Sequence, residues 1–146
     1  MEINGLPAHA LLVHLVVVLL PLTAVAAIVV SAWPAAQRKL TFLVPLGAVV
    51  GALAVPITTR AGEDLAKQLG NPPFIDKHAN FGGMVLPWAV ALAVTTLAQW
   101  LYLRRSGATN APRLVLAALV VASAMGTATV VVLTGDSGAR AVWGSR

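Results

Sequence analysis

Four long apolar runs, separated by short polar connections, account for most of the chain. They cover residues 7–31, 40–59, 81–103 and 112–134. Each run has about the 20 residues that an α-helix needs to cross the hydrocarbon core of a bilayer. The pattern therefore predicts an all-α protein, an integral membrane four-helix bundle, with a single membrane domain over residues 1–146.

Proline and glycine positions predict where these helices bend and stop. Pro7 and Pro112 begin their runs, where a first helical turn tolerates the missing N–H. Four other prolines lie further inside the runs, where the missing N–H removes a backbone hydrogen bond and kinks a helix: Pro21, Pro45, Pro56 and Pro87. After the second run, the stretch GEDLAKQL could extend the helix into water before the sequence GNPP at residues 70–73 ends it. No internal repeat is evident in the letters of the sequence.

The composition agrees with a membrane location. Hydrophobic residues make up 58% of the chain and charged residues 10%, against about a quarter charged in soluble domains. Cysteine is absent, which excludes disulfides, iron–sulfur clusters, thiolate metal sites and cysteine catalysis. The first run is longer than the roughly 7–15-residue core of a signal peptide, and only Glu2 is charged before it. We therefore expect a retained spanning helix.

The net charge of +5 comes from bases that lie between the apolar runs, which indicates membrane topology rather than nucleic-acid binding. The N-terminal tail has no base, whereas the first and third connections are flanked by several: Arg38, Lys39, Arg104, Arg105 and Arg113. We therefore expect both termini on the outer side of the membrane. The other side has as many bases, so their number alone leaves the reverse orientation open: Arg60, Lys67, Lys77, Arg140 and Arg146.

An even number of crossings brings four segments to the same face of the membrane, whichever face that is. These segments are the start of the first helix, the end of the second, the start of the third and the end of the fourth. All three histidines and all five acidic residues fall in or beside them. The opposite rim has only bases and small polar residues, so we expect a functional site at the first rim.

The two histidines of the first run cannot both face the same neighbour. His9 and His14 are five residues apart, which on a helix rotates them by about 140° and separates them by about 7.5 Å. We expect the deeper one, His14, to face the bundle interior, where an ionisable residue needs a partner. On the third helix His78 shares a stripe with Gly82, and a glycine there lets a helix or a flat ligand approach closely.

Two imidazoles on facing helices of a bundle can serve as the axial pair of a b-type haem. We predict that His14 and His78 ligate the haem iron, that His9 is a supporting or alternate ligand, and that Arg60 pairs with a propionate. A second group of candidates consists of other polar residues on this rim: Asp64, Asp136 and Ser137. The plainer interpretation is that the histidines hydrogen-bond the backbone or lipid headgroups.

Three motifs carry a resemblance to a known family. GLPAHALLVHLVVVLLP stands near the start, AGEDLAKQLG followed by IDKHANFGG in the middle, and TGDSGARAVWG at the end. With these motifs the chain resembles, over nearly its whole length, the bacterial membrane family called domain of unknown function 2231. The resemblance implies a four-helix protein of the bacterial cytoplasmic membrane. It also implies a set of polar positions: His9, His14, Gly62, Asp64, His78, Gly135, Asp136, Ser137 and Gly138.

The chain departs from the family pattern at three places. Ala10 stands where the family often has proline, Leu15 where it often has phenylalanine, and Asp136 where its last motif has histidine. Without that fourth imidazole, bis-histidine ligation can hold at most one haem. Some relatives are fused to Rieske-type iron–sulfur domains, which implies a redox setting for the family.

Three interpretations of function follow. The first is a cytochrome b-like electron-transfer protein that meets a quinone or a soluble redox partner at the outer face. The second is a transporter or channel subunit for a metal ion or small solute, with an entry site formed by five residues: His9, His14, His78, Asp64 and Asp136. The third is a structural protein whose polar rim docks a partner, and a homo-oligomer is possible. Hydrolase chemistry is disfavoured because Ser137 lacks a GxSxG context.

Overall fold

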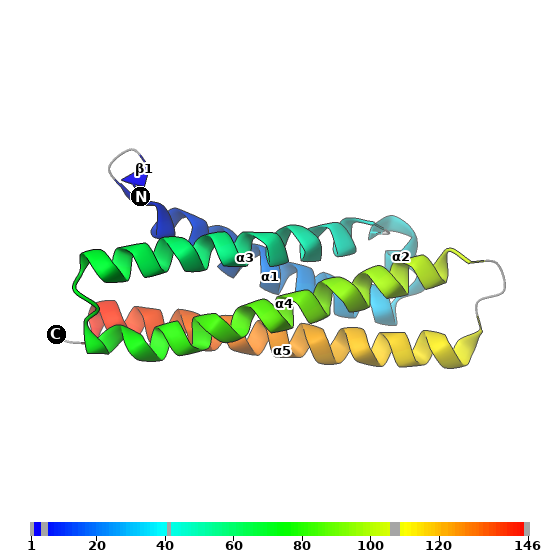
Figure 1. Ribbon diagram of the computed structural model, residues 1–146. Helices are drawn as coiled ribbons and strands as arrows, with labels where there is room; N and C mark the ends of the chain where they lie inside the picture. The colour runs from blue at the N-terminus through cyan, green and yellow to red at the C-terminus, as the bar shows by residue number, and fades with distance from the viewer. Residues whose placement is uncertain (1, 4–5, 41, 106–108, 145–146) are drawn as a thin grey trace.

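The computed structural model describes residues 2–3, 6–40, 42–105 and 109–144. Four long helices form an elongated bundle (Figure 1): α1 (Ala8–Ala32), α3 (Leu43–Gln68), α4 (Asp76–Leu103) and α5 (Asn110–Trp143). The shorter elements are the antiparallel pair β1 (Glu2–Ile3) and β2 (Leu6–Pro7), the helix α2 (Pro34–Leu40) and the 3₁₀ helix η1 (Pro73–Ile75). The all-α fold predicted from the apolar runs is confirmed. Gly5 of the first motif and Arg146 of the tail lie outside the described residues.

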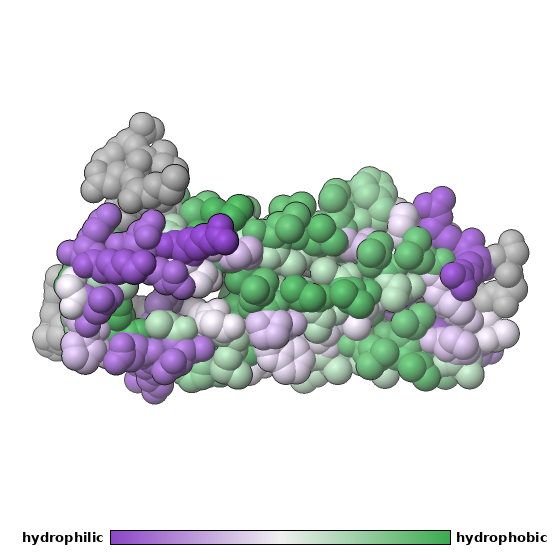
Figure 2. All heavy atoms as spheres, viewed as in Figure 1, coloured by the Kyte–Doolittle hydropathy of each residue, from purple (hydrophilic) through white to green (hydrophobic). Residues whose placement is uncertain are grey.

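The outer surface of the bundle is apolar over its middle. Each of the four long helices is long and apolar enough to cross a membrane. Large apolar side chains on them point outward, among them Val18, Leu22 and Val132, which are 63–65% exposed. Figure 2 shows green, hydrophobic spheres along the middle of the visible face and purple, hydrophilic ones gathered at its two ends. Because such a surface suits hydrocarbon rather than water, the chain is an integral membrane protein.

The helices extend past the predicted runs, mainly at one end of the bundle. α3 continues to Gln68 and α5 to Trp143, and α4 begins at Asp76, so much of the connection predicted around residues 60–80 is helical. The stretch GEDLAKQL keeps α3 going until Gly70 and Asn71 adopt positive φ angles of 78° and 51° and reverse the chain. The predicted stop at residues 70–73 is confirmed. The predicted first connection instead contains α2.

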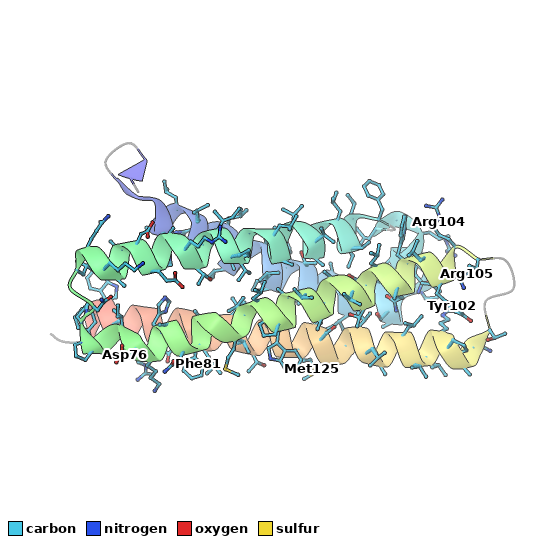
Figure 3. All side chains as sticks on the ribbon, viewed as in Figure 1. Asp76, Phe81, Tyr102, Arg104, Arg105 and Met125 are labelled. Atoms are coloured by element: carbon cyan, nitrogen blue, oxygen red, sulfur yellow. The ribbon has the colours of Figure 1, made fainter. Side chains whose placement is uncertain are left out.

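The long helices pack in the cyclic order α1, α3, α4, α5, so α1 lies diagonally opposite α4 and α3 opposite α5. α1 and α4 begin at the same end of the bundle, where α3 and α5 finish (Figure 1). We call this the polar end, and the end that carries α2 the basic end. Figure 3 shows Asp76 at the polar end and Arg104 and Arg105 at the basic end. The predicted gathering of four helix ends at one rim is confirmed.

Small side chains let the helices approach closely along the core. Alanines such as Ala27, Ala48 and Ala124 are fully buried in it. A Cβ atom added at Gly126 would lie 2.1 Å from Cε3 of Trp88, and one added at Gly51 would lie 2.5 Å from Cδ2 of Leu20. Helix contact in a membrane depends on such small residues, so these glycines are packing positions.

The two halves of the bundle repeat one burial pattern. Among the described residues, the buried ones on α1 are Val16, Leu20, Thr23, Ala24, Ala27 and Val30. Shifting each of them by the 69 residues that separate His9 from His78 gives the buried residues of α4, which are Val85, Ala89, Leu92, Ala93, Thr96 and Gln99. The buried residues of α3 and α5 match almost as closely when shifted by the 76 residues from Thr58 to Thr134. The α1–α3 and α4–α5 pairs are therefore two structural repeats, which the letters of the sequence did not reveal.

Candidate functional site

Two histidines meet at the polar end, one from each repeat. His9 lies in the first turn of α1 and His78 in the first turn of α4, and both are half-buried. Their ring centroids are 6.2 Å apart and the ring planes are nearly perpendicular, at 83°. Since α1 and α4 are diagonal neighbours that touch little elsewhere, the pair lies where the two repeats face each other across the bundle.

Each ring is fixed by a backbone carbonyl of the second helix in its own repeat. Nδ1 of His9 lies 3.0 Å from the carbonyl oxygen of Thr58 on α3, and Nδ1 of His78 lies 3.0 Å from that of Thr134 on α5. A carbonyl can only accept, so Nδ1 must carry the proton in both rings. In the neutral state Nε2 of each ring then has a free lone pair, which is the arrangement by which proteins prepare a histidine to bind a metal.

A glycine faces each ring four residues beyond the carbonyl that holds it. A Cβ atom added at Gly62 would lie 2.9 Å from Cε1 of His9, and one added at Gly138 would lie 3.0 Å from Nδ1 of His78. The first distance is shorter than real Cβ contacts and the second lies at the lower edge of the tight range, so a larger residue at either place would require the imidazole to shift. Each repeat therefore contributes a histidine, a threonine carbonyl and a glycine in the same relative positions.

The structure does not bring His14 and His78 together. The side chain of His14 is exposed, and its Nδ1 lies against the carbonyl oxygen of Ala10 one turn earlier in the same helix. The expectation that His14 faces the bundle interior is wrong. The 140° rotation between the two histidines of α1 allows one of them to face inward, and that one is His9.

The other predicted site residues lie at the polar end but do not converge on the imidazoles. Arg60 and Asp64 are exposed on α3, and Arg60 is about 200° around the helix from Thr58. Asp136 is exposed and pairs with Arg140, with 2.9 Å between the carboxylate and the guanidinium. Within the described residues, no group of three or more histidine, aspartate or glutamate side chains is arranged to hold a metal ion. The predicted five-residue metal entry site is therefore not assembled.

Ser137 and Gly82 both lie beside Thr134. The buried hydroxyl of Ser137 donates to the Thr134 carbonyl oxygen at 2.9 Å, so this oxygen accepts from Ser137 and from His78. A Cβ atom at Gly82 would meet only Cγ2 of Thr134, at 3.9 Å. The first repeat has Ala61 where the second has Ser137. Alanine at that position gives the Thr58 carbonyl, which holds His9, no second side-chain donor.

The stripe of buried residues on α1 explains why His9 faces inward, but α1 is apolar around almost its whole circumference, so the sequence alone does not mark that stripe. Val16, Thr23 and Val30 follow His9 at seven-residue intervals and are all buried, because seven residues bring a helix back to almost the same face. The residue seven positions after His14 is Pro21. Val18 and Val25, which lie on the same side of α1 as these two, are 63% and 58% exposed. Thr58 and Thr134 contact the imidazoles through their backbone carbonyls, and the sequence does not show which carbonyls will do so.

A protein-family model described as "Predicted membrane protein (DUF2231)" matches residues 5–146. The chain belongs to this family. The match includes both repeats of the bundle and every residue of the paired-histidine site, and it confirms the family resemblance of the three motifs. No curated protein and no solved structure matches this DUF2231 chain.

Proposed function

We propose that this DUF2231 protein binds one b-type haem between His9 and His78 and takes part in electron transfer. The observation that carries the proposal is the meeting of two imidazoles whose Nδ1 atoms are both bonded to carbonyls. This proposal keeps the predicted cofactor, haem, and replaces the predicted ligand His14 by His9, because His14 points out of the bundle.

The ring separation fits two ligands on one metal. A metal–imidazole bond is about 2.0–2.1 Å long and a ring nitrogen lies about 1.1 Å from the ring centre, so opposed imidazoles have centroids about 6 Å apart. The centroids of His9 and His78 are 6.2 Å apart. The two rings meet edge to face, so joint ligation would require an imidazole to turn its Nε2 toward the other ring.

The surroundings suit a flat ligand that reaches water at one edge. Gly62 on α3 and Gly138 on α5 have no side chain beside the two rings, and Gly82 leaves free space next to Thr134. Figure 2 shows the visible face hollowed between α3 and α4 near the polar end. The contact between Arg60 and a propionate stays a prediction. Arg60 is exposed and lies on the outward side of α3.

Haem held by two imidazoles supplies one-electron chemistry without an open position for substrate. In this proposal the chain orients the two rings through the Thr58 and Thr134 carbonyls, and these bonds raise the basicity of Nε2. Its apolar helices keep the inner side of the site dry. A quinone or a soluble redox protein would exchange electrons at the polar end.

An absorption spectrum tests the proposal directly. Protein extracted in detergent should show a Soret band, or develop one on adding haem, and sharp α and β bands on reduction with dithionite. His9→Ala and His78→Ala should each abolish this low-spin spectrum. His14→Ala is the matched control, since it removes the same side chain from the exposed face of α1, and it should leave the spectrum unchanged.

Two results would overturn the assignment. Protein that neither contains haem nor acquires a Soret band when haem is added is no cytochrome, and the histidines then hold together the two helices of each repeat through their carbonyl bonds. A low-spin spectrum that His14→Ala abolishes while His9→Ala preserves it would return the ligand role to His14.

We also propose that the polar end, and with it both termini, faces the outside of the bacterial cytoplasmic membrane. The support is the base-only composition of the opposite end, which is typical of a cytoplasmic side. The chain has no cysteine, so single cysteines report topology cleanly. Asn71→Cys should react in intact cells with a membrane-impermeant maleimide, and Thr109→Cys should react only after the cells are broken. The reverse pattern would invert the orientation.

A further inference from the structure

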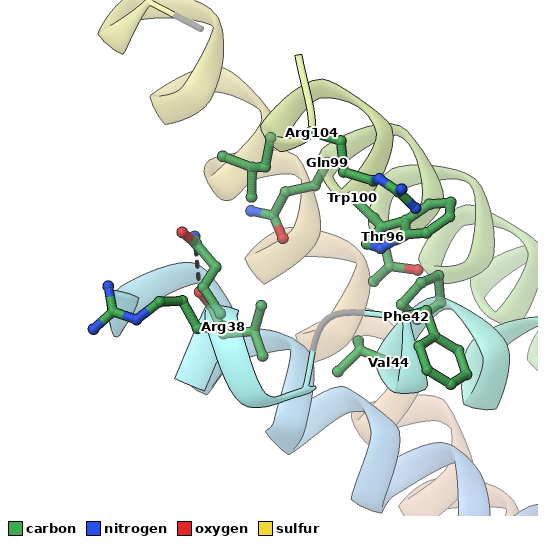
Figure 4. Close-up of a pocket in the computed structure, with 11 residues that line it drawn as sticks. Arg38, Phe42, Val44, Thr96, Gln99, Trp100 and Arg104 are labelled. Atoms are coloured by element: carbon green, nitrogen blue, oxygen red, sulfur yellow. Dashed lines mark hydrogen bonds between the residues drawn. The ribbon is translucent and has the colours of Figure 1, made fainter. Parts of the chain in front are cut away.

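A second candidate ligand-binding site lies at the basic end, far from the histidines. It is a pocket of about 470 Å³ between α2, the start of α3 and the last turns of α4 (Figure 4). Its lining is mainly apolar and aromatic, and includes Phe42, Val44, Trp100 and Leu103. The volume falls within the range of about 300–1,000 Å³ that is usual for small-molecule sites.

The pocket has polar groups at its inner wall. Thr96 and Gln99 line it and are almost completely buried, at 2% and 4% exposure. The Gln99 amide nitrogen donates to the hydroxyl of Ser31 at 3.1 Å, and since an amide nitrogen has two hydrogens, one remains available to an acceptor. An apolar pocket with one donor at its base suits the ester region of a lipid.

Two arginines flank this pocket, and within the described part of the chain neither pairs with a carboxylate. Arg38 and Arg104 both line it; Figure 4 shows Arg104 over Trp100 at one wall and Arg38 projecting outward from the opposite wall. The guanidinium carbon of Arg104 lies 4.9 Å from the centre of the Trp100 ring. All five acidic residues of the chain lie at the other end, and among the described residues the ion pair that forms is between Asp136 and Arg140.

We propose that this pocket binds an acidic phospholipid. An acyl chain would lie against Phe42, Val44 and Leu103, and the phosphate would bind Arg104 and Arg38 at the edge. Charge complementarity favours an anionic headgroup, because the basic end has no acid to neutralise its arginines, and basic pockets between spanning helices are known sites for such headgroups. The apolar volume favours a lipid over free phosphate. The site is independent of the haem proposal.

Native mass spectrometry of the detergent-extracted protein tests this inference. Long-chain phosphatidylglycerol should bind with one saturable site, and phosphatidylcholine of the same chains should bind at least fivefold more weakly. Arg104→Gln and Arg38→Gln should each weaken phosphatidylglycerol binding by about fivefold, which is the contribution of one basic residue near an anionic lipid surface. Glycerol phosphate, which has the head without the chains, should not compete at concentrations that saturate the lipid.

Arg113→Gln is the matched control, because Arg113 is at the basic end, in the first turn of α5, and does not line the pocket. It removes the same charge and should leave the affinity unchanged. Equal binding of phosphatidylcholine, an equal loss in Arg113→Gln, or displacement by glycerol phosphate would each overturn the proposal. The haem spectrum is recorded on the same samples and does not depend on any of these outcomes.

Discussion

The two repeats of the bundle are alike where they face the histidines and different where they pack. In each, a histidine on the first helix bonds to a threonine carbonyl on the second, with a glycine four residues further on. Along the helices, however, the first repeat packs Leu20 on Gly51 and the second packs Trp88 on Gly126. The core thus repeats which positions are buried, whereas the site also repeats the residue types; this is the symmetry expected if the paired imidazoles act as one unit, as proposed.

The glycines beside the rings give the largest test of this symmetry. Gly62→Ala and Gly138→Ala should each weaken haem binding by about 10- to 100-fold, the range for residues that orient a metal ligand, because the new methyl would displace His9 or His78. Haem titration followed at the Soret band measures the effect. The controls are Gly83→Ala and Gly135→Ala, whose added methyl meets nothing within 4 Å. A loss confined to one repeat would show that the two rings are not equivalent.

A smaller effect should distinguish the packing of the two repeats. Gly126→Ala places a methyl within 2.1–2.6 Å of three Trp88 ring atoms, whereas Gly51→Ala places one against the tip of the flexible Leu20 side chain. The first change should lower the free energy of unfolding by about 1–3 kcal/mol, as overpacking of a core does. The second should cost less, since leucine can move and alanine favours the helix. Thermal unfolding in detergent, followed by circular dichroism, measures both; equal losses would contradict the argument.

The smallest expected effect concerns a residue that makes the two sites unequal. Ser137 shares the Thr134 carbonyl with His78, whereas Ala61 brings no second side-chain donor to the Thr58 carbonyl that His9 bonds. Ser137→Ala should strengthen the Nδ1 bond of His78, make that imidazole a better donor to ferric iron and lower the midpoint potential. A change of a few tenths of a kcal/mol corresponds to about 10–20 mV, from 59 mV per tenfold for one electron.

The reciprocal variant sharpens this prediction. Ala61→Ser gives the Thr58 carbonyl a second side-chain donor and should raise the midpoint potential by a similar amount. The double variant should return it to near the original value. Spectroelectrochemical titration measures all three proteins, and shifts of the same sign in both single variants would show that the shared carbonyl is not the cause.

Much of the fold followed from the sequence because crossing a membrane is a constraint on composition and length. Four apolar runs predicted the four long helices, and the residues at 70–73 predicted the end of α3. The helical extensions at the polar end were underestimated, since polar residues there keep helical geometry outside hydrocarbon. Those extensions matter, because His78 and Gly138 both lie beyond the predicted apolar runs.

The candidate site was predicted only in part. The predicted end of the bundle does bring His78 beside a second imidazole, but depth along the helix was taken as the guide to which histidine of α1 faces inward. Packing is the better guide: the face with Val16, Thr23 and Ala27 is buried, and His9 continues it. The carbonyl partners could not have been predicted, because every residue has a carbonyl and only the contact selects one.

The sequence by itself determined that the chain enters a membrane, crosses it four times and carries its histidines and acids at one rim. These are consequences of the composition, of the lengths of the apolar runs and of the even number of crossings, and they hold for any packing of the helices. Tertiary structure decided the rotation of each helix about its own axis, and therefore that His9 rather than His14 meets His78. That rotation depends on the sum of the packing contacts along the whole helix. One imidazole contributes little to this sum compared with a stripe of small residues.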